Sequence, residues 1–129
     1  MSNTTATILQ WNIQGVKNKK PEITNLINQF NAQVLALQET LMPVKFLHKI
    51  PGYTVMGCDG THNRRNHGGV AIYIHQDTPF SNITLSTSIQ AVAATIHLKR
   101  KFTICNIYSY CEYQNQEALL TTLLVWRIQ

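Results

Sequence analysis

Three polar residues stand where strand-like runs of the sequence end. Asn12 closes "ATILQWN", Glu39 follows the apolar run "VLAL", and Tyr108 closes "FTICNIY". If these strands run parallel, their carboxyl ends share one edge of a sheet, where ligands bind in α/β proteins. A carboxylate beside an amide oxygen can hold Mg²⁺, which keeps several waters and is commonly shared with substrate phosphates. A tyrosine hydroxyl could donate to a phosphate oxygen, so the pattern indicates metal-assisted phosphate chemistry.

Each of these residues also fits a simpler role. Glu39 could be solvated, or could cap a short helix that begins near Pro43. Asn12 could serve the turn that Gly15 starts, which is a common use of asparagine. Tyr108 could be a core aromatic residue whose hydroxyl reaches the rim. Spacing alone does not choose between these roles and the metal site.

The elements that must position these residues alternate at the start of the chain. A first strand is predicted over Ala6–Asn12, and Pro21 suits the first turn of a helix. The next strand is predicted in "QVLALQET", which is apolar on both faces as a covered parallel strand would be. Strand, helix and strand form a βαβ unit, whose crossover is right-handed. The helix carries apolar residues at the spacing of one helical face, namely Ile23, Leu26, Ile27 and Phe30.

The middle of the chain is predicted to be a β-meander, because short strand-like runs are separated there by Gly, Pro, Asn and basic turns. These runs are "YTVMGC", "GGVAIYIH", "NITL", "AVAATIHLK" and "FTICNIY". The last segment, Asn115–Trp126, has the composition of a helix.

Composition narrows the function classes. The 129 residues suit one domain, and 44% hydrophobic with 13% charged residues suits a globular fold. A net charge of +5 and a pI near 9.3 favour polyanionic partners. Three cysteines without C-x-x-C spacing argue against a disulfide framework and a zinc knuckle. No signal peptide or apolar run of membrane-spanning length is present, so we expect an intracellular protein without a membrane partner.

Four segments in order, "ILQWNIQG", "LALQET", "GGVAIYI" and "FTICNIYS", resemble the endonuclease/exonuclease/phosphatase superfamily, the DNase I-like group. The match is closest to the apurinic-type endonuclease domain of non-LTR retrotransposons, the jockey-like and R1-like elements, which carry a W-N-x-x-G and a Q-E-T segment. The four segments extend from Ile8 to Ser109, and their order is more specific than any one of them.

The resemblance implies a role for each residue of the opening pattern. Asn12 looks like the family's active-site asparagine near the scissile phosphate and metal, and Glu39 looks like its metal-binding glutamate. Tyr108 looks like the tyrosine that contacts the phosphate. The family uses a divalent cation, normally Mg²⁺ (or Mn²⁺), to stabilise charge on the phosphate while a water attacks in line. Candidates for contact with double-stranded DNA, by position, are Arg64, Arg65, Asn66 and Lys17, although two such arginines more often lie in a solvated loop than in a phosphate clamp.

The departures from the family pattern matter as much. The family completes its catalytic set with a D-x-N segment and a late Asp-His pair, whereas the only aspartates here are Asp59 and Asp77. Residues 1–129 are therefore expected to be the N-terminal part of the domain. The expected fold is α/β, a partial DNase I-like sandwich with one mixed β-sheet and flanking helices, its second sheet missing. We expect little or no nuclease activity from this chain alone.

Three functions follow from the resemblance. The first is the N-terminal part of a Mg²⁺-dependent DNA endonuclease, whose nick in nuclear DNA primes retrotransposition and whose missing C-terminal half is followed by a reverse transcriptase. The second is a phosphodiesterase or phosphatase of the same superfamily that acts on lipid. The third is a relic that only binds nucleic acid, through the basic residues Lys17, Lys19, Lys20, Arg64 and Arg65.

Overall fold

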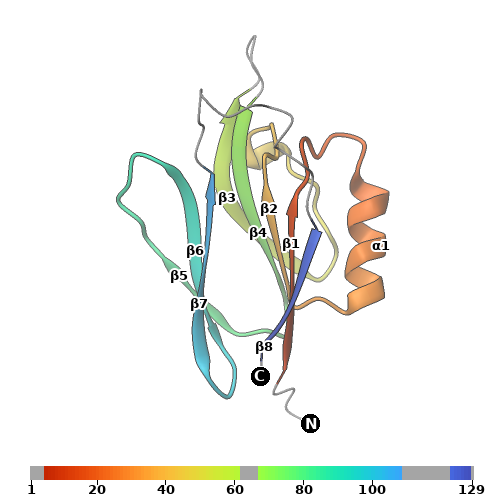
Figure 1. Ribbon diagram of the computed structural model, residues 1–129, viewed down its shortest axis with the longest axis vertical. Helices are drawn as coiled ribbons and strands as arrows, with labels where there is room; N and C mark the ends of the chain where they lie inside the picture. The colour runs from red at the N-terminus through yellow and green to blue at the C-terminus, as the bar shows by residue number, and fades with distance from the viewer. Residues whose placement is uncertain (1–4, 62–66, 109–122, 129) are drawn as a thin grey trace.

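The computed structural model describes residues 5–61, 67–108 and 123–128, which form two facing β-sheets (Figure 1). The five-stranded sheet has the strand order β3-β4-β2-β1-β8, and the three-stranded sheet has the order β5-β6-β7. The elements are β1 (Ala6–Asn12), α1 (Lys20–Phe30), β2 (Val34–Gln38), the short 3-10 helix η1 (Val44–Phe46), β3 (Tyr53–Thr61), β4 (His67–His75), β5 (Phe80–Ile83), β6 (Gln90–His97), β7 (Lys101–Tyr108) and β8 (Leu123–Ile128).

The βαβ unit has the predicted form. β1 and β2 are parallel neighbours, with a register that runs from Ile8 opposite Val34 to Asn12 opposite Gln38. The helix α1 joins them and has Pro21 in its first turn, where a missing backbone N–H costs nothing. It ends at Asn31 with a φ of 48°, the left-handed conformation common after helices. The ends of β1 and β2, two of the three strand ends that the sequence predicts to share an edge, are therefore neighbours.

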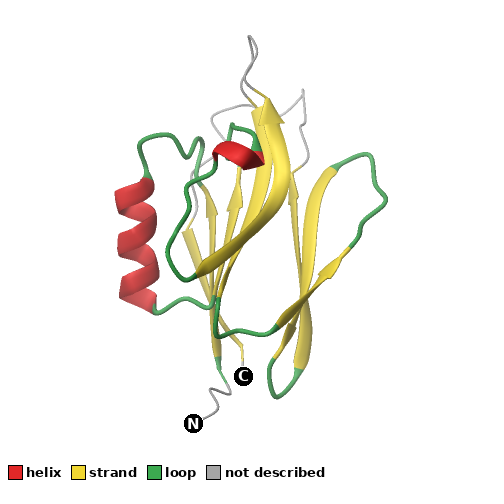
Figure 2. Cartoon of the chain, turned by 180° about the vertical axis from the view of Figure 1, so that it is seen from behind, coloured by secondary structure: helices red, strands yellow, loops and turns green. Residues whose placement is uncertain are grey.

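Two apolar layers hold the fold together. Between α1 and the five-stranded sheet, the buried residues include Leu9, Ile23 and Leu35. Between the two sheets, they include Val34, Ile72 and Ile96. Figure 2 shows the three layers in order, with the helix on one side of the five-stranded sheet and the smaller sheet on the other. Because β2 has a covered face on each side, its residues Val34–Leu37 are all buried.

The α/β sandwich is confirmed, but the expectation that the second sheet is missing is wrong. The segments β5, β6 and β7 do not extend the first sheet; they pair only with one another and pack on its inner face. The alternation of β6 and β7 explains this, because inward-facing Ile96 and Phe102 cover apolar residues of the larger sheet. Tyr108 therefore lies on a different sheet from Asn12 and Glu39.

The C-terminal helix prediction is wrong where the structure can test it. Residues 115–122 lie outside the described residues, and Leu123–Ile128 form β8, antiparallel to β1. Trp126 stands opposite Ile8, and its indole Nε1 donates to Gln10 Oε1 at 3.3 Å. Pairing with the free edge of β1 decides the conformation of a segment whose Leu, Val and Trp residues suit either element. None of the described helices has the length and apolar character that crossing a membrane requires.

Candidate functional site

The structure brings Asn12 and Glu39 into contact. Asn12 is the last residue of β1 and pairs with Gln38, the last residue of the parallel strand β2, so Glu39 follows at the same edge. The side-chain amide of Asn12 donates a hydrogen bond to the Glu39 carboxylate. The other end of that amide, Asn12 Oδ1, is buried and has no hydrogen-bond partner among the described residues. A carboxylate and an amide oxygen therefore lie close together at this edge.

The backbone explains why β2 stops before Glu39. Glu39 has a φ of 55°, so the chain leaves the strand there in the left-handed region. The loop that follows is fixed on both sides: Gly15 N–H donates to Glu39 O at 2.8 Å, and Thr40 N–H donates to Gly69 O at 3.1 Å. A non-glycine residue in this conformation is held there by its surroundings, a pattern that concentrates at functional sites. The turn directs Glu39 out of the ladder and toward the end of β1.

The electrostatics of this pair favour a cation. Burial raises the pKa of Glu39 above its ordinary value, and the hydrogen bond from Asn12 lowers it to a smaller extent. Partial burial makes the charged form of this carboxylate less favourable, and a cation bound beside it would favour that form while its charge also attracts the amide oxygen. Mg²⁺ fits such a pair because it takes one or two protein oxygens and completes its shell with water and substrate phosphate. Over the described ranges, no cluster of three or more His, Cys, Asp or Glu residues is found.

Tyr108 reaches the same edge from the other sheet. It is the last residue of β7 and stands opposite Gln90 of β6. Gln90 Oε1 accepts a hydrogen bond from Gly69 N–H at 2.6 Å, and Gly69 O in turn accepts from Thr40 N–H. The end of β7 is thus tied to the turn that follows Glu39. The half-buried Tyr108 faces this end of the sandwich, although it comes from the second sheet rather than from a parallel neighbour.

One further residue that sequence reasoning missed connects the sheets here. Asn106 of β7 is buried, and its Nδ2 donates to Leu37 O at 2.8 Å and Ala71 O at 2.9 Å. Its Oδ1 accepts from Gln38 Nε2 at 2.5 Å. A signal was present in "FTICNIY", because Asn106 continues the inward-facing series of Phe102 and Ile104 with a polar residue.

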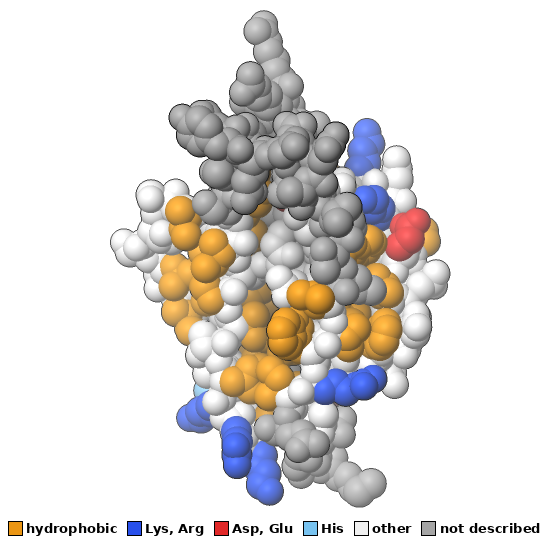
Figure 3. Space-filling model, in the orientation of Figure 1, with side chains coloured by type: hydrophobic (Ala, Val, Ile, Leu, Met, Phe, Trp, Pro, Cys, Tyr) orange, Lys and Arg blue, Asp and Glu red, His pale blue; other side chains and the backbone are white. Residues whose placement is uncertain are grey.

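The basic residues predicted to touch DNA are only partly described. Lys17 is exposed in the loop after β1, on the side of the sheet where Asn12 ends its strand. Lys19 nearby is engaged within that loop: its ammonium donates to Ile13 O and lies 5.8 Å from the centre of the Trp11 ring. Figure 3 shows Lys and Arg side chains beside the start of α1 and over the β6–β7 turn. Arg64, Arg65 and Asn66 lie outside the described residues.

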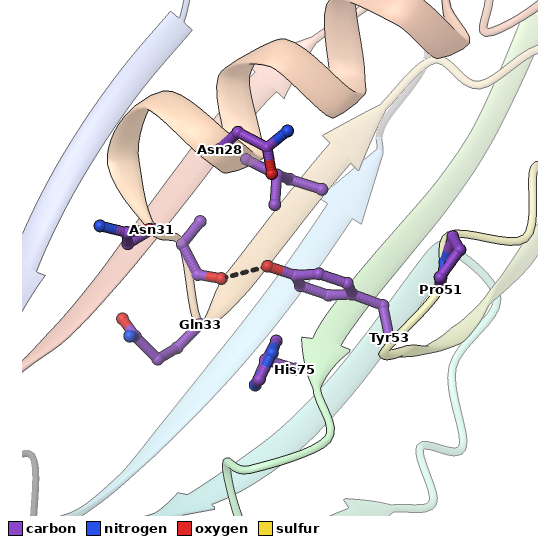
Figure 4. Close-up of a pocket in the computed structure, with 8 residues that line it drawn as sticks. Asn28, Asn31, Gln33, Pro51, Tyr53 and His75 are labelled. Carbon is purple, nitrogen blue, oxygen red and sulfur yellow. Dashed lines mark hydrogen bonds between the residues drawn. The ribbon is translucent and has the colours of Figure 1, made fainter.

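A separate pocket of about 350 Å³ lies at the opposite end of the larger sheet. It opens between the end of α1 and the start of β3, where Tyr53 Oη donates to Ala32 O at 2.6 Å (Figure 4). Its lining contains side-chain amides and the His75 ring, but no Asp, Glu, Lys or Arg. A pocket without a carboxylate or a fixed positive charge does not suit a metal or a phosphodiester, so it is not the counterpart of the Asn12–Glu39 edge.

Comparison with known proteins agrees with this fold. The model of the Endonuclease/Exonuclease/phosphatase family matches residues 9–119. A similar solved structure is the AP endonuclease LMAP from Leishmania major, with a TM-score of 0.59, 14% identity, and coverage of 81% of this chain and 40% of that one. Another is the APE2 catalytic domain from Xenopus laevis, with a TM-score of 0.55, 16% identity, and coverage of 87% and 47%. The chain thus spans less than half of each, and what they share is the fold. No curated protein matches the sequence.

Proposed function

This chain belongs to the endonuclease/exonuclease/phosphatase family, and from that premise we propose that it is the N-terminal part of a metal-dependent nuclease that hydrolyses a phosphodiester bond in DNA. One observation carries the proposal. Asn12 and Glu39 meet at the carboxyl ends of two parallel strands, where a partly desolvated carboxylate and a buried amide oxygen without a hydrogen-bond partner among the described residues lie side by side. Ligands in α/β folds bind at this edge.

Each residue of the site has a distinct task in this proposal. The Glu39 carboxylate and Asn12 Oδ1 would hold Mg²⁺ (or Mn²⁺), which when bound neutralises charge that develops on the phosphate. Asn12 also orients Glu39 through the hydrogen bond that its amide donates. The Tyr108 hydroxyl, at the end of β7, donates to a phosphate oxygen. Lys17 contacts the DNA backbone next to the cleaved bond, where an exposed ammonium positions the duplex without reading its sequence.

The groups that activate the attacking water must come from elsewhere, since the sequence holds neither a D-x-N segment nor an Asp-His pair. We propose that a C-terminal half of the domain supplies them and that the completed site nicks double-stranded DNA in the nucleus. The W-N-x-x-G and Q-E-T segments at residues 11–15 and 38–40 support a place among non-LTR retrotransposon endonucleases. There the nick primes reverse transcription by a reverse transcriptase that follows the domain.

Metal binding by this chain tests the proposal directly. We would titrate Mn²⁺ into the labelled protein and follow paramagnetic broadening of its backbone NMR signals. The signals of Asn12 and Glu39 are expected to broaden first, and Glu39→Gln should weaken Mn²⁺ binding at least tenfold, because the charge of the proposed carboxylate ligand is lost. Glu22→Gln is the matched control, because it removes an exposed carboxylate at the start of α1, and it should bind Mn²⁺ as the wild type does. Equal broadening in Glu39→Gln would rule out the site.

A second candidate, a module that only binds nucleic acid, is favoured by the net charge of +5 and by the exposed Lys17. Its affinity for a DNA duplex would fall steeply with salt and would depend neither on Mg²⁺ nor on Glu39. Duplex binding by the wild type and Glu39→Gln, with and without Mg²⁺, separates the two functions.

A further inference from the structure

Asn106 is a buried polar residue in a largely apolar interface. It is 4% exposed, and the layer between the two sheets around it is built from residues such as Val34, Ile72 and Ile96. Burying an amide costs free energy unless its hydrogen bonds are made. All three of its contacts cross from one sheet to the other: Nδ2 donates to Leu37 O and Ala71 O, and Oδ1 accepts from Gln38 Nε2.

These contacts select one placement of the smaller sheet, in addition to the more exposed hydrogen bonds that Gln90 makes to Gly69 and Asp59. Apolar contacts are not directional, so Ile and Val side chains would tolerate a shift of one sheet over the other. A buried amide does not tolerate it, because a shift of one residue would leave its donors and acceptor unpaired. Leu37 on β2 and Ala71 on β4 stand directly opposite each other, so Asn106 is fixed relative to two strands at once.

Tyr108 lies two residues beyond Asn106, on the same face of β7. Glu39 directly follows Gln38, the last residue of β2. We propose that Asn106 is a positioning residue: it sets the placement of the three-stranded sheet on the five-stranded one and so holds Tyr108 at the edge where Asn12 and Glu39 meet. The part that concerns Tyr108 rests on the proposed function; the placement of the sheets does not.

A spin-label experiment without metal tests the placement. Cys105 is exposed on the outer face of β7 and can carry a nitroxide once Cys58 and Cys111 are replaced by serine. The profile is the paramagnetic broadening of each backbone amide signal, followed along β2 and β4 of the larger sheet. In the otherwise wild-type chain it should have one sharp maximum near Leu37 and Ala71. In Asn106→Leu, which keeps the side-chain volume, the profile should shift or spread along β2 and β4, while amides of the β6–β7 ladder stay protected. An unchanged profile would overturn the proposal.

Two further variants keep the test decisive. Thr103→Val is the matched control, because Thr103 lies on the outer face of the same strand and its hydroxyl bonds to that of Thr95 within the smaller sheet. Its profile should equal that of the wild type. If Asn106→Leu does not fold, Asn106→Ala takes its place, since it removes all three hydrogen bonds without adding bulk. A shifted or spread profile in Asn106→Ala would support the proposal, and an unchanged one would overturn it.

Mn²⁺ then separates this inference from the proposed function. In the wild type, Mn²⁺ at Glu39 should broaden the ring signals of Tyr108. In Asn106→Leu, the signals of Asn12 and Glu39 should broaden at the same Mn²⁺ concentration while the broadening of Tyr108 falls several-fold. Absence of Mn²⁺ binding in the wild type would contradict the proposed function alone, because the spin-label profile would still decide the role of Asn106.

Discussion

Asn12 donates its side-chain amide to the Glu39 carboxylate, and the two residues close neighbouring parallel strands. This contact joins the ends of β1 and β2 across a βαβ unit. An asparagine and a glutamate that are 27 positions apart in the sequence therefore lie side by side. The burial of the pair has effects that can be measured without any substrate.

Replacing Glu39 by glutamine should stabilise the metal-free chain at neutral pH. Burial raises the pKa of Glu39, so the folded chain binds its proton more tightly than the unfolded chain does. The stability from this group is therefore present at low pH and is lost as the pH rises through the folded-state pKa. Urea unfolding should show Glu39→Gln above the wild type at about pH 7 and close to it at about pH 3.

Glu22→Gln is the control for that measurement. Glu22 is an exposed carboxylate in the first turn of α1, where negative charge is favourable to the helix. Its replacement should lower the free energy of unfolding slightly at neutral pH, the opposite sign to Glu39→Gln. A loss of stability in Glu39→Gln at neutral pH would contradict the desolvation of Glu39.

Gly69→Ala should destabilise the turn that supports the site. Gly69 has a φ of 90°, and a Cβ there would lie 2.1 Å from Thr40 Oγ1. Gly15→Ala is the matched comparison, because Gly15 has a similar φ of 100° but only Leu41 Cδ1 at 3.5 Å. In both variants the strained backbone should lower the free energy of unfolding by about 1–3 kcal/mol. Gly69→Ala should lose more, because its Cβ also meets Thr40 Oγ1. Equal losses in urea unfolding would show that the contact with Thr40 is not tight.

Lys17→Ala should weaken binding to duplex DNA and lower the slope of log affinity against log salt by about one, because one phosphate contact is lost. Lys101 provides the control, since it is exposed at the start of β7, the far end of that strand from Tyr108. Lys101→Ala should leave the slope unchanged. The same decrease in both variants would mean that the charge acts without a defined binding surface.

Tyr73→Phe should cost about 1 kcal/mol of stability. The Tyr73 hydroxyl donates to His48 O at 2.8 Å, and the residue is 1% exposed, so the carbonyl would be left without this donor. Burial also raises the pKa of Tyr73 to about 12. The folded chain should therefore lose stability as the pH rises from the ordinary tyrosine value toward 12. Ultraviolet titration of wild type and Tyr73→Phe identifies the late-titrating phenol.

The first third of the fold was predictable from local patterns. β1 has the predicted bounds of Ala6–Asn12, and α1 follows the helical spacing of Ile23 and Ile27. The contact of Asn12 with Glu39 followed from one general rule, that parallel neighbours end at the same edge. These features depend on residues close in sequence, for which periodicity is informative.

The remainder depends on long-range pairing, which periodicity does not encode. Alternation in β7 indicates a strand but not which sheet the strand joins. The placement of Tyr108 therefore needed Asn106, whose partners Leu37 and Ala71 are distant in sequence. β8 was missed for the same reason. Its composition suits a helix or a strand, and the long-range pairing with β1 decides between them.

The antiparallel pairing of Ala6 with Ile128 also has a kinetic consequence. Contacts between residues so far apart in sequence form late, because the loop that joins them must close first. β1 can meet β2 as soon as Val34–Gln38 have been made, yet its other edge stays unpaired until Leu123–Ile128 leave the ribosome. We therefore expect the pairing of β8 with β1, the first strand of the chain, to complete the larger sheet. Indole fluorescence from Trp126, which lies on β8, offers a probe of that final step.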